Sequence, residues 1–346
     1  GRQPYYYPDY DYVKQPQNTQ ILGAAKITGK TRKGLSIGIL ESVTNKENAE
    51  FVNDAGQIEK IAVEPMTNYF AGRLEQEMNK GNTIIGGMFT STNRFVKDEH
   101  LNELPANAYS GGVNFEHNWN NRKYTLSAKL VGSRVNGDST AMMNLQTSNR
   151  RLFQRPDVKV NRLDSTRTSL SGHGGFMSFS KNKNSGWRYM GWLSWLSPGL
   201  ELNDIGFLRK TDNINQVFWI GYSTPQPKGI FRRINLNFSE WMGWNFDGLF
   251  NSMGMNASTF FQFSNFWQFY LGTNYHTATN SDSHLRGGPV YILPQNLNLW
   301  IGFESNDRKK LRFEWDLSRQ ISEYNYLNDI WTSLEIKYKP IDRLKL

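Results

Sequence analysis

The sequence predicts an all-β fold, a transmembrane antiparallel up-and-down β-barrel. Three observations predict it: apolar and polar side chains alternate with a period of two, prolines avoid the predicted strands, and short connections alternate with long ones. The 346 residues are 38% hydrophobic with a mean hydropathy of −0.62, and no run approaches the roughly 20 apolar residues that a membrane helix needs. The composition therefore excludes a helical membrane protein and fits strands with one polar face.

The alternation is clearest in residues 123–130, 233–239 and 311–318. Many of the predicted strands reach the length of about 9–11 residues that crosses a membrane. All 12 prolines lie between or at the ends of the predicted strands, because proline lacks the N–H that a central ladder needs. The predicted strands are residues 21–28, 34–44, 66–78, 82–92, 107–119, 122–134, 168–181, 187–197, 213–223, 232–242, 253–264, 266–276, 297–304, 311–318 and 331–339.

The connections alternate strictly between short and long. The short ones are residues 29–33, 79–81, 120–121, 182–186, 265 and 305–310, and the long ones are residues 45–65, 93–106, 135–167, 198–212, 277–296 and 319–330. Two connections of intermediate length, residues 224–231 and 243–252, fit the short–long alternation less clearly. Short periplasmic turns and long external loops are typical of bacterial outer-membrane barrels, so we expect an integral protein of that membrane.

We expect residues 1–346 to be a single barrel domain that is incomplete at both ends. Residues 1–20 are predicted to be an external loop whose incoming strand is absent, and residues 344–346 to start a further strand after a turn at 340–343. The full barrel would then have 16 or more strands.

Aromatic residues, 14% of the chain, gather near both ends of the predicted strands, where membrane proteins carry interfacial belts. The belt beside the short turns is predicted to contain Trp119, Tyr124, Trp187, Trp267 and Tyr338, and the belt beside the long loops Tyr109, Trp195, Trp241, Tyr275 and Trp331.

The alternation assigns side chains to two faces. The lipid-facing set is predicted to include Leu126, Leu130, Ile234, Leu236, Phe238, Phe261, Phe269, Leu299, Ile301, Phe313, Leu334 and Ile336. The predicted lining of the lumen comprises Arg73, Glu75, Glu77, Glu116, Lys123, Lys129, Arg233, Arg312, Glu314, Asp316, Glu335 and Lys337. Buried charges are costly unless they are paired or hydrated, so this mixture of signs predicts a wet or ion-paired lumen.

The long connection 135–167 is basic, and two interpretations of it stay open. It is a candidate plug that enters the lumen and pairs its arginines with the lumen carboxylates, or an exposed loop that touches lipopolysaccharide phosphates or a partner. The basic residues of the candidate plug are Arg150, Arg151, Arg155, Lys159 and Arg162.

We expect no catalytic centre, cofactor or metal site. The five histidines show no metal-ligand spacing, and the Gly172–Gly175 run is more typical of relief of crowding on a strand than of an active loop. The neighbouring carboxylates Glu75 and Glu77, like those of Glu314 and Asp316, have the spacing of glycosidase pairs, but a basic residue shares the face of each pair.

The net charge of +9 is spread along the chain, which favours contact with anionic lipid or solutes over nucleic-acid binding. Cysteine is absent, so disulfides and thiolate sites are excluded.

Several segments resemble an uncharacterised Bacteroidota outer-membrane family: residues 21–31 (ILGAAKITGKT) with 34–38 (GLSIG), 64–69 (EPMTNY), 153–157 (FQRPD) and 197–207 (SPGLELNDIGF). The resemblance implies an outer-membrane barrel that follows a signal peptide and a β-sandwich similar to carbohydrate-binding module family nine. It carries no catalytic residues over to this chain.

Three functions are compatible with these observations. The first is a surface anchor or scaffold, linked to carbohydrate through another domain or docking outer-membrane or periplasmic partner proteins. The second is a diffusion channel or transporter for small polar or anionic solutes. The third is an outer-membrane glycoside hydrolase, which the absence of a catalytic constellation from the sequence disfavours.

Overall fold

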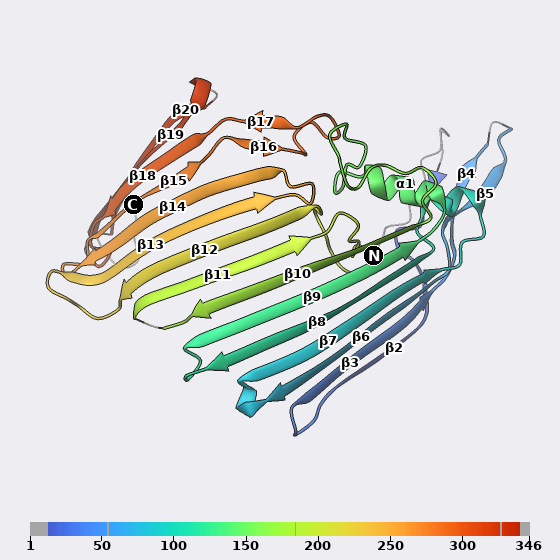
Figure 1. Ribbon diagram of the computed structural model, residues 1–346, viewed down its shortest axis with the longest axis horizontal. Coiled ribbons are helices and arrows are strands. Elements are labelled where there is room, and N and C mark those ends of the chain that lie inside the picture. The colour runs from blue at the N-terminus through green and yellow to red at the C-terminus, as the bar shows by residue number, and fades with distance from the viewer. Residues whose placement is uncertain (1–12, 54, 184, 326, 340–346) are drawn as a thin grey trace.

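The computed structural model describes residues 13–53, 55–183, 185–325 and 327–339, most of which form one curved antiparallel sheet of fifteen strands (Figure 1). The order of the strands in space follows their order in the chain. In that order they are β2 (Ile21–Lys30), β3 (Leu35–Thr44), β6 (Thr67–Met78), β7 (Thr83–Arg94), β8 (Asn107–Trp119), β9 (Tyr124–Asn136), β10 (Ser169–Lys181), β11 (Gly186–Leu196), β12 (Asn213–Thr224), β13 (Phe231–Trp244), β14 (Phe250–Phe263), β15 (Gln268–His276), β18 (Asn296–Glu304), β19 (Leu311–Ser322) and β20 (Asn328–Tyr338).

All fifteen predicted strands are confirmed, and they form one antiparallel sheet that is not closed into a barrel. Among the described residues, β2 pairs only with β3 and β20 only with β19, so the sheet is open. The alternation of side chains determines the strands and their faces, whereas closure depends on pairing between two edges, which no local pattern encodes. The expectations for residues 1–12 and 340–346 lie outside the described residues.

The connections alternate as predicted, so the sheet has a short-turn end and a long-loop end. The prediction for residues 319–330 is wrong in extent, because the β19–β20 ladder continues through Arg319 and Ile330 and leaves only residues 323–327 as the connection. The long loops also contain small elements that the sequence did not predict: β1 (Val13–Lys14), β4 (Glu47–Val52), β5 (Ile58–Glu64), α1 (Ser139–Thr147), β16 (Thr279–Ser281), β17 (Tyr291–Leu293) and the 3-10 turns η2 (Glu99–Glu103) and η3 (Glu323–Asn325). A further 3-10 turn, η1 (Asn79–Gly81), makes the short β6–β7 turn.

The ladder registers divide the side chains of the sheet between two faces. All twelve residues of the predicted lipid-facing set lie on one side, which we call the apolar face. For example, Leu236 is opposite Tyr222 on one side and Thr259 on the other, and Phe313 is opposite Ile336. The other side, the polar face, carries Ser, Asn, Gly and charged residues. Such a two-faced antiparallel sheet is what period-two alternation produces.

Two of the ten predicted belt residues point away from the expected face. Trp241 and Trp331 lie on the polar face, because Trp241 is opposite Val217 and Gly254, and Trp331 is opposite Ser318. The Trp241 ring lies where a Cβ on Gly254 would be, at 2.3 Å from the ring. Parity within a strand, not nearness to its end, decides the face of a side chain.

The best packed core lies at the long-loop end and not within the sheet. Ala141, Met142 and Phe153 from the β9–β10 connection pack against Val135 and Leu170 at the ends of β9 and β10. No helix of the described residues is long and apolar enough to cross a membrane.

Candidate functional site: the loop-covered part of the polar face

The predicted lumen-lining charges of the ladder share the polar face and pair with one another. Arg73 contacts Glu75 at 2.5 Å, and Arg312 contacts Glu314 at 2.7 Å and also Glu304. Lys337 pairs with Glu335. Each of these carboxylates therefore has a cationic partner, which offsets the cost of removing its charge from water.

Of the other predicted lining residues, Glu77 has a charged partner, and the rest lie beside neutral groups. The Glu77 carboxylate pairs with Lys30, and Glu116 accepts a hydrogen bond from the Asn118 amide at 2.9 Å. The Asp316 carboxylate accepts a hydrogen bond from the Tyr270 hydroxyl. Lys123 lies in a short turn with its ammonium 5.2 Å from the Tyr124 ring, and Lys129 lies 6.0 Å from the Phe176 ring. Arg233 is opposite Gln262 on β14.

A loop that the sequence analysis did not single out as a plug lies directly on the polar face. Residues 197–206 of the β11–β12 connection, here called the docked loop, cross β10 at Gly172. A Cβ on Gly172 would lie 2.1 Å from the Leu200 nitrogen, and a Cβ on Gly199 would lie 2.1 Å from the Ser171 carbonyl oxygen. The two backbones therefore touch, and glycine is required on both sides of the contact.

The docked loop reaches well into the sheet. Leu202, Ile205 and Gly206 line a cavity of about 220 Å³ with Met88 of β7 and Val131 of β9, which lie about five residues from the long-loop end. At about 3.3 Å per residue, the loop extends roughly 17 Å along the strands.

The Gly172–Gly175 run is explained by crowding, as predicted. Gly172 and Gly174 make room for Leu200, and Gly175 makes room for the Trp195 ring.

A buried ion pair holds the docked loop to the β9–β10 connection. The Arg151 guanidinium contacts the Glu201 carboxylate at 2.8 Å, and the two side chains are 0% and 3% exposed. Arg151 also donates to the carbonyl oxygens of Pro198 and Leu200, and the Asn203 backbone N–H donates to Glu201 at 2.7 Å. The polar groups of both side chains are therefore satisfied, which a buried pair requires.

The electrostatics of this pair follow from burial and mutual attraction. Burial alone would raise the pKa of Glu201, but the Arg151 charge and the hydrogen bonds from Asn203 outweigh it, so the pKa of the carboxyl lies below its ordinary value. Burial lowers the pKa of Arg151, although Glu201 opposes that shift. Both groups are therefore charged at neutral pH.

A second ion pair fixes the docked loop from the other side. The Arg94 guanidinium at the end of β7 contacts the Asp204 carboxylate at 2.6 Å, with side chains 6% and 16% exposed. Arg94 also donates to the Pro105 carbonyl oxygen. Together with Arg151–Glu201, this pair braces the docked loop against the end of β7 and the β9–β10 connection.

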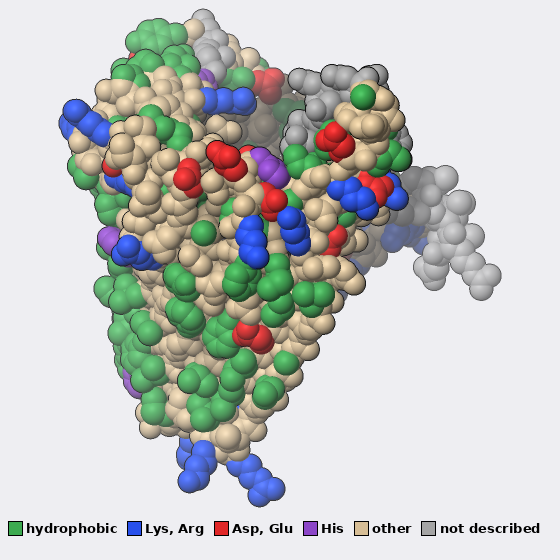
Figure 2. Space-filling view, turned by 90° about the vertical axis from the view of Figure 1, so that its right-hand side faces the viewer, with side chains coloured by type: hydrophobic (Ala, Val, Ile, Leu, Met, Phe, Trp, Pro, Cys, Tyr) green, Lys and Arg blue, Asp and Glu red, His purple; other side chains and the backbone are tan. Residues whose placement is uncertain are grey.

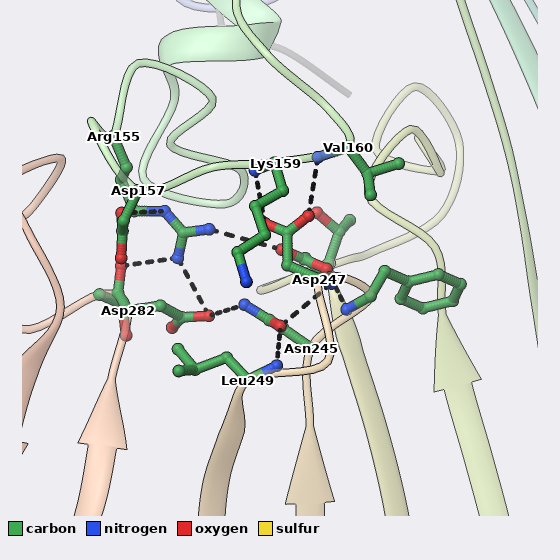
Figure 3. Close-up of polar contacts among 12 residues, drawn as sticks. Arg155, Asp157, Lys159, Val160, Asn245, Asp247, Leu249 and Asp282 are labelled. Carbon is green, nitrogen blue, oxygen red and sulfur yellow. Dashed lines mark hydrogen bonds and ion pairs between the residues drawn. The ribbon is translucent and has the colours of Figure 1, made fainter.

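A third cluster joins three long loops around Arg155 (Figure 3). The Arg155 side chain, 4% exposed, lies 3.1 Å from Asp282 of the β15–β18 connection and 3.7 Å from Asp212 of the β11–β12 connection. Asp247 of the β13–β14 connection accepts from the backbone N–H groups of Lys159 and Val160. Arg155, Lys159 and Asp247 also line a cavity of about 360 Å³.

The two aspartates beside Arg155 differ in their pKa. Burial raises the pKa of Asp212 above its ordinary value despite the Phe246 backbone N–H and Arg155. Burial also acts to raise the pKa of Asp282, but hydrogen bonding and charge from Lys210 and the charge of Arg155 outweigh it, so that pKa is lowered. Burial therefore dominates the pKa of Asp212, whereas its cationic neighbours dominate that of Asp282.

The structure places the five basic residues of the candidate plug at the long-loop end. Arg150 donates to the Leu208 carbonyl oxygen, Arg162 donates to the Val158 carbonyl oxygen, and Lys159 is exposed. Arg151 and Arg155 pair with loop carboxylates, as described above. The segment that extends along the polar face is the docked loop, held in place by the 135–167 connection.

Sequence reasoning missed the acidic partners Glu201, Asp204, Asp212 and Asp282. A usable signal was present for the first two: charged residues within the otherwise apolar stretch 197–207 indicate buried, paired carboxylates. Among the described residues, no group of three or more His, Asp or Glu side chains is arranged to hold a metal ion.

Comparison with known proteins gives a family and a distant structural similarity. The family described as "Domain of unknown function (DUF5916)" matches residues 3–346. No curated protein matches the chain. Among solved structures, the crystal structure of BamA from Haemophilus ducreyi lacking POTRA domains 1–3 is similar at 7% identity and a TM-score of 0.38, covering 94% of this chain and 75% of that one.

Proposed function

The chain belongs to the DUF5916 family, and we propose that it is the membrane-embedded β-barrel of an integral bacterial outer-membrane protein that acts as a surface anchor or scaffold. The observation that carries this proposal is the two-faced sheet of strands nine to fourteen residues long. Such strands suit a membrane, because about 9–11 residues cross it and one face must be apolar. We further propose that the sheet closes into a barrel of 16 or more strands in the full protein, since bacterial barrels of one chain have an even number.

The braced loops favour the scaffold role. Three buried ion pairs cross-brace the long loops, together called the loop cap: Arg151–Glu201 and Arg155–Asp282 each join two loops, and Arg94–Asp204 joins a loop to the end of β7. A rigid, cross-braced surface suits the presentation of a domain or the docking of a partner, because little conformational entropy is lost on binding.

Topology is tested by labelling single cysteines on whole cells with a membrane-impermeant maleimide. Asn149→Cys lies in the exposed β9–β10 connection, and Gln226→Cys lies in an exposed short turn. We expect the Asn149 site to be labelled on intact cells and the Gln226 site only after the outer membrane is opened. The reverse pattern would invert the topology, and equal labelling of both sites on intact cells would contradict membrane insertion.

A diffusion channel for small polar or anionic solutes is the second candidate. The favouring observation is the charged polar face, on which Arg73, Glu75, Arg312 and Glu314 lie in ion pairs. Single-channel conductance in planar bilayers separates the candidates. We expect the full protein to be silent, because the docked loop covers part of this face, and to conduct after deletion of residues 199–206. If the intact protein conducts as well as the deletion variant does, the result favours the channel.

A link to carbohydrate, and an origin in Bacteroidota, rest on the sequence resemblance alone. We propose that a sugar-binding β-sandwich is joined to the barrel in the full protein. Binding of the full protein to insoluble polysaccharides supports this link if the barrel chain alone does not bind, and no binding by the full protein refutes it.

A further inference from the structure

The seven short turns carry a strong excess of positive charge. The residues between the strands at this end include ten Lys or Arg residues against a single acidic residue, Asp307. The ten, here called the short-turn rim, are Arg32, Lys33, Lys80, Arg122, Lys123, Lys183, Lys228, Arg308, Lys309 and Lys310. Figure 2 shows Lys and Arg side chains projecting from the lower tip of the molecule, where Figure 1 places the β2–β3 and β6–β7 turns.

Several cations of the long-loop end have carboxylate partners, unlike most of those of the short-turn rim. At the long-loop end, Lys46 pairs with Asp98 at 2.8 Å, Lys60 with Glu50 at 3.0 Å and Lys210 with Asp282 at 2.8 Å. In the short-turn rim, leaving Lys310 aside, the cations form no ion pair within the part of the chain that the structure describes. The charge of these nine cations is therefore available to an external anion.

The turns also hold these cations close together. The Phe266 ring contacts two guanidinium groups, 4.5 Å from that of Arg232, next to the rim in β13, and 3.9 Å from that of Arg308. The Asn306 side-chain amide donates to the Asn265 carbonyl oxygen, which links two neighbouring turns. Farther along the rim, Arg122 donates to the Gly81 carbonyl oxygen at 3.3 Å and so joins the β6–β7 and β8–β9 turns.

The position of the rim indicates which anions it meets. On the apolar face just inside the rim, Trp119 stacks on Tyr124 at 5.8 Å and on Phe179 at 5.9 Å, and Trp267 stacks on Phe303 at 6.1 Å. Aromatic residues of membrane proteins gather at the level of the headgroups. The rim follows directly after this level along the strands, which places it at the level of the headgroup phosphates if the sheet is inserted as proposed.

We infer that the short-turn rim is a contact surface for the anionic phospholipid headgroups of the leaflet on that side. The inference rests on the proposed membrane insertion and adds a lipid preference to it. Anionic lipids attract clusters of Lys and Arg next to a membrane, and six of the seven short turns contribute cations to the rim. The long-loop end has no comparable excess of positive charge among its described residues, because acidic residues such as Glu50, Asp98 and Asp282 lie among its cations.

The test is lipid retention by the folded protein in detergent, counted by native mass spectrometry. Phosphatidylglycerol and phosphatidylcholine with identical acyl chains are added in equal amounts. We expect at least about threefold preference for phosphatidylglycerol. The variant Lys183→Gln/Lys228→Gln/Lys309→Gln should lose most of this preference. The matched control Lys97→Gln/Lys159→Gln/Arg209→Gln removes the same charge from exposed sites at the long-loop end and should keep it.

Equal losses in the two triple variants would overturn the inference, since net charge alone would then explain the preference. Displacement of the lipid by inorganic phosphate, beyond the effect of sodium chloride at the same ionic strength, would assign the rim to a free anion instead. Insertion into vesicles of each lipid is measured in parallel. Failure to insert into either lipid refutes the proposed function, whereas insertion without lipid preference refutes only this inference.

Discussion

Gly172→Ala is expected to displace the docked loop from the polar face. The added Cβ would meet the Leu200 nitrogen at 2.1 Å and the Gly199 carbonyl carbon at 2.4 Å, both of which are backbone atoms. No rotamer change can relieve a backbone contact, so either β10 or the loop must move. We expect a loss of about 3 kcal/mol in the free energy of unfolding, the upper end of the usual range for overpacking.

The measurement combines urea unfolding from lipid vesicles with limited trypsin digestion. Displacement should open the Arg151 site to trypsin, because Arg151 is buried beneath the docked loop. Gly191→Ala is the matched control, since a Cβ there meets its nearest heavy atom at 3.8 Å. Identical unfolding energies and digestion patterns in the two variants would show that the loop does not rest on Gly172.

Arg151→Met is expected to destabilise the loop cap even more. The substitution keeps most of the side-chain volume but leaves the Glu201 carboxylate, 3% exposed, without its cation. Removing one partner of a buried ion pair usually costs about 3–5 kcal/mol. The Pro198 and Leu200 carbonyl oxygens would also lose their donor.

A double-mutant cycle with Glu201→Gln measures the coupling between the two side chains. We expect the double variant to cost less than the sum of the single variants, because a neutral amide does not need the missing cation. Arg167→Met is the control: its pair with Asp164 is exposed, and such pairs contribute about 1 kcal/mol or less. A cost for Arg151→Met no larger than for Arg167→Met would contradict the bracing role.

The strands of the sheet could be predicted because the pattern that determines each of them lies within a short stretch of sequence. Leu311, Phe313 and Trp315 alternate with polar residues within one strand, and that pattern alone assigns both the strand and its faces. The same reasoning fails for β16 and β17, each of which has three residues, too few for a period to be recognised. It fails for Trp241 because nearness to a strand end says nothing about which face the ring occupies.

The loop cap was not predictable because its contacts join distant parts of the chain. The space for Leu200 is created by Gly172, and Arg155 meets Asp282, 127 residues away. The basic residues of the 135–167 connection suggested a plug, but their acidic partners could only be assigned once the loops were placed together. Buried pairing of this kind depends on tertiary packing and leaves no periodic signal.

The central claim is that the apolar face of the sheet meets lipid, and two adjacent residues of β13 test it most directly. Leu236 lies on the apolar face and Asn237 on the polar face. The free energy of folding into phospholipid vesicles is measured for Leu236→Arg and Asn237→Arg. We expect Leu236→Arg to cost about 2–4 kcal/mol, the cost of arginine near the bilayer midplane. Asn237→Arg should cost less than about 1 kcal/mol, as is usual for polar sites. Equal costs for the two substitutions would contradict the claim.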